Sequence, residues 1–203
     1  MPSIMFHELI GYKFAKRNKQ FDCNSFYLGL IVPDSVNAYG FAEKDARWKA
    51  HARDKDLDKW QANILKFYKD NIGCFEQSYL TGYLVHVLTD IICDKIYVEE
   101  LYQRLLNEGY DYNTAYSYYE EGIRKFENNN INEDWWKYVK EKILDAEIIE
   151  INDMPKKMIE DELSYVIKHY GERNFEEVSF ITDKFADNVL NCLEKILVQH
   201  RII

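Results

Sequence analysis

Apolar residues recur at helical spacing along most of the chain. In the first half, the spacing predicts a helix over residues 3–18, on which His7 lies, and a second helix that starts near Asp56 and stops before Gly73. The stretch 75–106 is apolar nearly all round and contains no proline. We therefore expect one long buried helix there, or two in close succession.

The second half is more amphipathic and more charged. Its periodicity predicts helices at about 112–127, 133–146, 155–170 and 175–200. Asn128 to Asn130 form a polar break between the first two of these helices, and Pro155 suits the start of the third.

Residues 32–55 interrupt the helical pattern of the first half. Pro33 biases its predecessor away from helix, and Gly40 breaks any continuation. We expect a long irregular connection here. Because connections of this length are uncommon inside compact domains and are often functional, this segment is a candidate site.

Composition supports an all-α fold. The 203 residues include only 8 glycines and 3 prolines, which is too few for the many turns of a β-sandwich or barrel. Hydrophobic residues make up 47% and charged residues 30%, which are globular values. No linker separates the halves, so we expect one helical domain, a multi-helix bundle, over residues 1–203.

The net charge, the hydrophobic runs and the cysteine spacing exclude several classes of protein. The net charge of −9 opposes docking on duplex nucleic acid. No apolar run reaches the roughly 18 residues of a transmembrane segment, and the first residues lack a signal-peptide pattern, so a cytoplasmic location is expected. The four cysteines show no C-x-x-C spacing, which indicates reduced thiols in the core.

The strongest chemical signal is the pair His86 and Asp90. Side chains four residues apart lie on the same helical face, here within an apolar segment. A buried carboxylate is costly unless it is paired, hydrogen-bonded or bound to a metal. From this helix alone, a His–Asp ion pair or a carboxylate held by tyrosine hydroxyls is favoured over a metal.

Three further residues change that balance. His7, Asp34 and His51 also fall in the first 90 positions, each beside aromatic or apolar residues. Imidazole nitrogens together with carboxylate oxygens suit a borderline ion such as zinc. The candidate metal centre therefore belongs to residues 1–100.

The ordered set of His7, the run FYLGLIVPDS with Asp34, His51, and GYLVHVLTD with His86 and Asp90 resembles the zinc-dependent phospholipase C family. That family is all-helical, with a core similar to the fungal single-strand nucleases.

The resemblance implies that one zinc is held by Asp34, His51, His86 and Asp90. It implies that Asp90 bridges to a second zinc held by His7, and that Asp34 doubles as the base that orients the attacking water. Lys49 and Arg53, close to His51, are candidates for binding phosphate oxygens, with a solvated surface as the alternative.

The chain also departs from the family pattern. It begins with Met1 rather than the metal-binding tryptophan of the secreted enzymes, position 96 is isoleucine where the family has a histidine, and no H-x-x-x-E pair occurs. We therefore expect one or two zinc ions rather than three. Asp94, Glu99 and Glu100 offer substitute oxygen ligands, but a helix-surface or first-turn role suits them better.

The sequence thus predicts a zinc-dependent hydrolase of small-molecule or lipid phosphoesters with an incomplete metal centre. Walker A, G-x-G-x-x-G and G-x-S-x-G motifs are absent. The alternative is a non-catalytic helical binding or structural protein that keeps the fold with one structural metal or none. The missing H-x-x-x-E half favours this alternative, whereas His and Asp ligands are typical of open catalytic sites.

Overall fold

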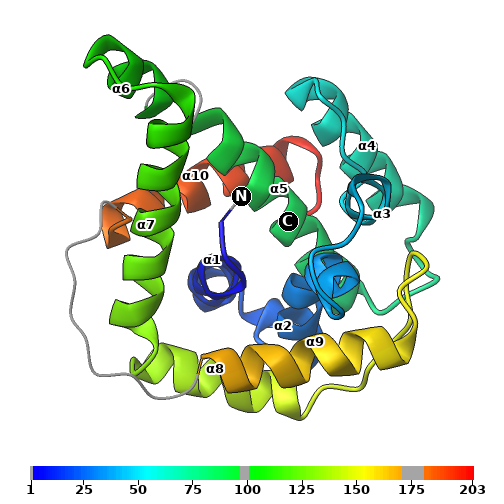
Figure 1. Cartoon of the computed structure of the whole chain (residues 1–203). Helices are drawn as coiled ribbons and strands as arrows, with labels where there is room; N and C mark the ends of the chain where they lie inside the picture. Colours follow the sequence, from blue (N-terminus) through cyan, green and yellow to red (C-terminus); the bar gives the residue numbers. More distant parts are fainter. Residues whose placement is uncertain (1, 97–100, 171–180) are drawn as a thin grey trace.

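The structure is a computed structural model that describes residues 2–96, 101–170 and 181–203, and this part of the chain is helical without a β-strand (Figure 1). The helices of the first half are α1 (Ile4–Arg17), the 3-10 helix η1 (Lys19–Phe21), α2 (Asn24–Ile31), the 3-10 helix η2 (Val32–Asn37), α3 (Lys44–Ala50), α4 (Leu57–Asp70) and α5 (Gln77–Ile96). Those of the second half are α6 (Gln103–Asn107), α7 (Tyr112–Asn130), α8 (Asp134–Leu144), α9 (Lys156–His169) and α10 (Asp183–Gln199).

Helices α1 and α5 form the centre of the arrangement. Helix α1 packs against α2, α5, α8 and α10, and Figure 1 shows α7, α8 and α9 around it on the outside. Helix α5 is buried on all sides from Tyr79 to Cys93, as its all-round apolar sequence predicts. One core cluster runs from Ile4 to Leu197 and so draws on both halves of the chain.

Two glycines bring the backbones of α2 and α5 into direct contact. A Cβ atom added to Gly82 would lie 2.1 Å from the Phe26 carbonyl oxygen, and one added to Gly29 would lie 2.2 Å from the Tyr79 carbonyl oxygen. No side chain larger than hydrogen fits at either position. This close approach places the end of α2 beside the middle of α5, where His86 lies.

The prediction that residues 32–55 form an irregular connection is wrong. It contains η2 and α3, and Pro33 lies in the first turn of η2, where a missing N–H costs no hydrogen bond. Helix α2 before it was also not predicted. Its run FYLGLI is apolar all round because α1, α5 and α8 all pack against it, so helical periodicity was hidden.

The helices of the second half follow the predicted ranges with two corrections. The polar residues Asn128 to Asn130 continue α7 instead of breaking it, and the Asn130 side chain donates to the Phe126 carbonyl at 2.9 Å. The last helix, predicted from 175, starts at Asp183 with Thr182 capping it, and residues 171–180 lie outside the described part.

The segment 75–106 was predicted to form one long helix or two in close succession. The described residues form two, α5 up to Ile96 and then α6, and residues 97–100 are not described.

The four cysteines are unpaired thiols, but the prediction that they lie in the core holds for only one. Cys93 is buried, Cys23 is half-buried, and Cys74 and Cys192 are exposed.

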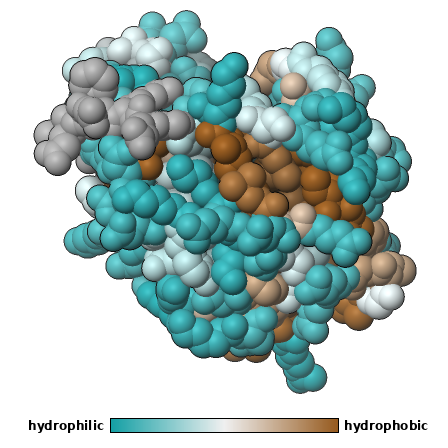
Figure 2. Space-filling view, turned by 90° about the horizontal axis from the view of Figure 1, so that it is seen from below, coloured by the Kyte–Doolittle hydropathy of each residue, from teal (hydrophilic) through white to brown (hydrophobic). Residues whose placement is uncertain are grey.

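Figure 2 shows one face on which hydrophilic residues surround a hydrophobic band. Within the residues that the structure describes, no helix has the length and apolar character needed to cross a membrane.

The contact between α2 and α5 yields a stability prediction. Gly82→Ala should destabilise the protein by about 3 kcal/mol, because the new methyl group meets a backbone carbonyl that cannot move aside. Gly11→Ala is the matched comparison and should cost less, since its added Cβ meets the Leu30 side chain, which can shift, instead of backbone. Urea denaturation measures both. Equal stabilities of the two variants would contradict the direct backbone contact.

Candidate metal centre

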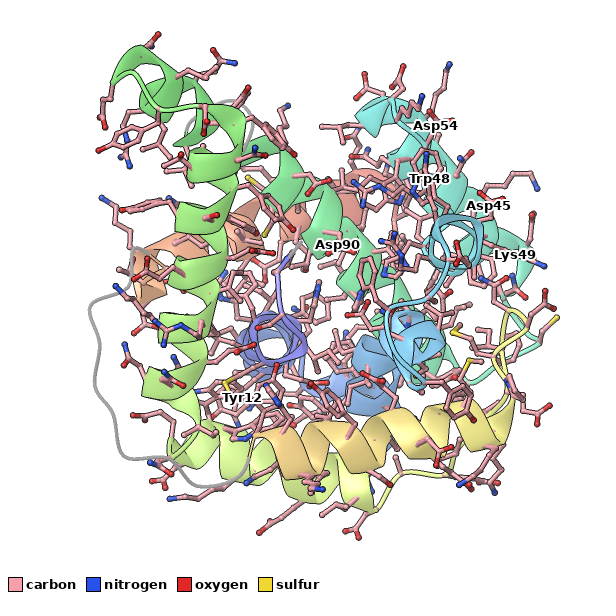
Figure 3. All side chains as sticks on the ribbon, viewed as in Figure 1. Tyr12, Asp45, Trp48, Lys49, Asp54 and Asp90 are labelled. Carbon is pink, nitrogen blue, oxygen red and sulfur yellow. The ribbon has the colours of Figure 1, made fainter. Side chains whose placement is uncertain are left out.

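Five side chains from four helical segments converge at one point in the core. His7 comes from α1, Asp34 from η2, His51 from the residue after α3, and His86 and Asp90 from α5. The side chains of the three histidines and Asp90 are at most 2% exposed, whereas Asp34 is 15% exposed. Figure 3 shows Asp90 on the part of α5 that lies between α1 and α3. The structure therefore brings together all five predicted ligands.

The two oxygens of Asp90 face different histidines. Oδ1 lies 3.3 Å from His7 Nε2, while Oδ2 lies 3.6 Å from His51 Nε2 and 3.7 Å from His86 Nε2. A carboxylate with this arrangement suits a bridge between two cation positions. This is the bridging role that the family resemblance implies for Asp90.

Asp34 approaches the same two histidines from η2. Its Oδ1 lies 3.4 Å from His51 Nε2 and its Oδ2 lies 3.9 Å from His86 Nε2. The Nε2 atoms of His51 and His86 are themselves 3.3 Å apart. Two carboxylates and two imidazole nitrogens thus surround one small space.

Backbone carbonyls fix the tautomers of these two histidines. His86 Nδ1 donates to the Leu30 carbonyl at 2.6 Å, and His51 Nδ1 donates to the Arg47 carbonyl at 2.9 Å. Because a carbonyl only accepts, each ring in its neutral form presents an Nε2 lone pair to the other. A hydrogen bond from the other ring nitrogen to a carbonyl is typical of metal-binding histidines. When both rings are neutral, their lone pairs face each other beside two carboxylates, an arrangement that suits a cation between them, either a proton on His51 or a metal ion.

Other polar atoms at this point are buried without a hydrogen bond of acceptable geometry. They are both ring nitrogens of His7 and both carboxylate oxygens of Asp90. The His7 ring stacks on the His86 ring, with centroids 3.7 Å apart and planes 12° apart. A buried polar group without a partner costs about 1–3 kcal/mol, so a metal ion that binds these atoms would offset that cost.

The atoms are close enough to share a metal ion. One ligand atom each from His7, Asp34 and His86 lie within 4.8 Å of one another, and the same is true of His51, His86 and Asp90. The donors are nitrogen and oxygen, which suit zinc. The residues present therefore fit one or two such ions.

Burial and mutual charge set the pKa values in the centre. Burial alone would raise the pKa of Asp90, but His7, His86 and His51 outweigh it and lower that pKa. Burial alone would also raise the pKa of Asp34, but His51 and His86 outweigh burial and lower that pKa. Burial and the adjacent His7 lower the pKa of His86 to about 3, so this ring is neutral at neutral pH. The pKa of His51 is raised, since Asp34 and Asp90 outweigh the opposing effect of burial.

Hydrogen bonds to the main chain hold the end of α3 in place. Trp60 Nε1 donates to the His51 carbonyl at 2.8 Å, and the Tyr83 hydroxyl donates to the Ala50 carbonyl. These contacts connect α3 to α4 and α5, and so fix His51 against the other ligands.

The two predicted phosphate-binding residues have different positions. Lys49 is exposed, forms an ion pair with Asp153, and lies in Figure 3 on the side of α3 away from Asp90. Arg53 forms a hydrogen-bonded ion pair with Asp94 at 2.8 Å and lies over the Trp60 ring. Asp94 thus occupies an ion pair near the helix surface, whereas Glu99 and Glu100 lie outside the described residues.

A cavity of about 590 Å³ reaches the centre at Asp34. Arg53 and Asp94 line this cavity, and Lys49 does not. Arg47 also lines it, although the sequence analysis did not select that residue. Arg47 lies four residues before His51, so the two side chains share a helical face. The sequence analysis did not use this spacing because it did not predict a helix over residues 44–50.

Glu162 is a second residue that the sequence analysis did not select. It is buried on α9, which packs against η2. Burial and then the Asp34 carboxylate raise the pKa of Glu162 to about 7. The second half of the chain thereby adds an acidic group to the surroundings of Asp34.

Comparison of the chain with protein-family models, with curated proteins and with solved structures finds no match. The resemblance to the zinc-dependent phospholipases C therefore stays a prediction, and the case for a metal centre depends on the geometry described above.

The protonation states predict how zinc affinity depends on pH. His51 keeps its proton above its ordinary pKa of 6.5, and zinc must displace that proton, whereas His86 has none to displace. Zinc affinity should therefore fall by about tenfold for each unit of pH below ~6.5 and level off above the raised pKa of His51. Titration calorimetry in two buffers of different ionisation enthalpy measures the affinity and the protons released. An affinity that is flat from about pH 5.5 to 8 would contradict these assignments.

Proposed function

We propose that this chain binds one or two zinc ions through His7, Asp34, His51, His86 and Asp90 and hydrolyses phosphoesters. The observation that carries the proposal is the pair of His51 and His86 Nε2 atoms, 3.3 Å apart, each with its Nδ1 held by a backbone carbonyl. Both carboxylates lie against this pair. Such an arrangement is stable when a cation occupies the space between the four groups.

The ligand set favours a catalytic ion over a structural one. Structural zinc sites are closed and rich in cysteine, whereas catalytic sites combine histidine and carboxylate with an open position. Among the described residues, no cysteine belongs to either group of candidate ligands. Asp34 reaches the cavity, which gives a substrate access to the centre.

The metal and the residues around it would have different roles in hydrolysis. Bound zinc would lower the pKa of a water molecule and neutralise charge on the phosphoester. Asp34, which joins the centre to the cavity, is placed to accept a hydrogen bond from the attacking water and orient it. Arg47, which lines the same cavity, would supply positive charge for phosphate oxygens, whereas the charge of Arg53 is paired with Asp94.

A purely structural metal is the second candidate function. It is favoured by the near-complete burial of His7, His51, His86 and Asp90. In that case the metal would add stability, and no phosphoester would be turned over.

Metal content provides the first test. The untagged protein should carry about one or two equivalents of zinc by elemental mass spectrometry, and His86→Ala should lose them because it removes a nitrogen shared by both candidate groups. His200→Ala, at the end of α10, is the control and should keep its metal. If the wild type takes up no zinc even when it is supplied, the proposal fails.

Hydrolysis provides the second test and separates the two candidate functions. The zinc-loaded protein should hydrolyse bis(p-nitrophenyl) phosphate or p-nitrophenyl phosphate. Asp34→Asn keeps the shape of the side chain but removes the basic oxygen, so it should lower kcat by about 100-fold or more. Release of nitrophenolate measures the rate. Zinc that raises the melting temperature without any hydrolysis would support the structural role instead.

A further inference from the structure

We propose that the substrate carries a flat aromatic group next to its phosphoester, and that the cavity beside Asp34 holds this group. The inference rests on the proposed function, because it takes the phosphoester to lie at the metal centre. It goes further by assigning the chemical class of the rest of the substrate.

The walls of the cavity are aromatic. Five ring side chains line it, namely Phe41, Tyr102, Tyr112, Tyr116 and Tyr119. Among the described residues that line it, no leucine, isoleucine, valine or methionine occurs. A cavity for an acyl or alkyl chain is expected to present such aliphatic side chains, whereas tyrosines offer ring faces for stacking and hydroxyls for hydrogen bonds.

Several of these rings are exposed although they are large. Phe41 is 80% exposed, Tyr112 is 56% exposed and Tyr116 is 40% exposed. Tyr112 and Tyr116 are stacked one turn apart on α7, with their planes 12° apart and their centroids 6.3 Å apart. In Figure 1, α7 and α3 lie on opposite sides of the start of α1, and both contribute to the cavity. A flat ligand would cover ring area that is otherwise in contact with water.

Charged side chains line the same cavity as the aromatic rings. Asp34 connects the cavity to the candidate metal ligands. The Arg47 guanidinium lies 3.9 Å from the Phe41 ring centroid, and its Nε donates to the Ala42 carbonyl. Its position is thereby fixed, with the terminal nitrogens still able to donate to an anion. The cavity thus combines a positively charged side chain with aromatic rings, next to a carboxylate of the candidate metal centre.

Binding of stable phosphonates tests the inference without relying on turnover. The probes are methylphosphonate, benzylphosphonate and cyclohexylmethylphosphonate, which carry the same anionic group. The last two are similar in size, and only one of them is aromatic. With the zinc-loaded full chain, calorimetry should show benzylphosphonate binding about 5- to 10-fold more tightly than cyclohexylmethylphosphonate, because stacking adds to simple burial.

Variants locate the preference. Tyr112→Leu and Tyr116→Leu keep an apolar side chain but remove a ring, so each should reduce the preference to about twofold or less and leave methylphosphonate affinity unchanged. Tyr118→Leu is the matched control, because Tyr118 is exposed to a similar extent on the same helix and does not line this cavity. It should keep the full preference.

The outcomes separate this inference from the proposed function. If methylphosphonate binds and the two larger phosphonates bind equally well, the aromatic assignment is wrong and the phosphoester function stands. A preference that survives both Tyr112→Leu and Tyr116→Leu also overturns it. If zinc is bound but no phosphonate binds, the aromatic assignment and the proposed hydrolase function fall together.

Discussion

Burial of two carboxylates and three imidazoles at one point is the constraint on which the structure depends. Ionised carboxylates are costly in a core unless positive charge compensates them, and the lowered pKa values of Asp34 and Asp90 mean that both stay ionised. His86 remains neutral and cannot provide that charge. The compensating charge must therefore come from a proton on His51, whose pKa is raised, or from a metal ion, which would satisfy more of the buried atoms at once.

The tight contact between α2 and α5 sets the geometry of this cluster. Because Gly29 and Gly82 allow the two backbones to touch, the last carbonyls of α2 reach the side chain of His86. The chain then enters η2 directly, which carries Asp34 back to the same histidine. The close contact between α2 and α5 thus orients the His86 ring and brings Asp34 close to it.

The sequence predicted the helical class from spacing and composition, and it predicted the five residues of the cluster from the spacing of His86 and Asp90 together with the family resemblance. The spacing of His86 and Asp90 holds within a single helix, and the apolar stripe of α1 carries His7 to the core. The supporting carbonyls of Leu30 and Arg47 gave no signal, since every residue has a carbonyl. Arg47 and Glu162 were missed because their proximity to Asp34 arises only from tertiary packing of α3 and α9 against η2. The helix η2 was missed because Pro33, which usually interrupts a helix, lies in its first turn.

The exposure of the ligands is uneven, and this bears on what the centre does. A closed structural site would be expected to bury all its ligands equally, yet Asp34 alone among the five is part of a cavity wall. The same cavity holds Arg47, a positive charge that a metal needed only for stability would not require. Positive charge, an accessible carboxylate and exposed aromatic rings meet at one opening, and each of them has a use if an anionic ligand enters there. The arrangement of the cavity thus favours catalysis over a structural role, even though the other four ligands are fully buried.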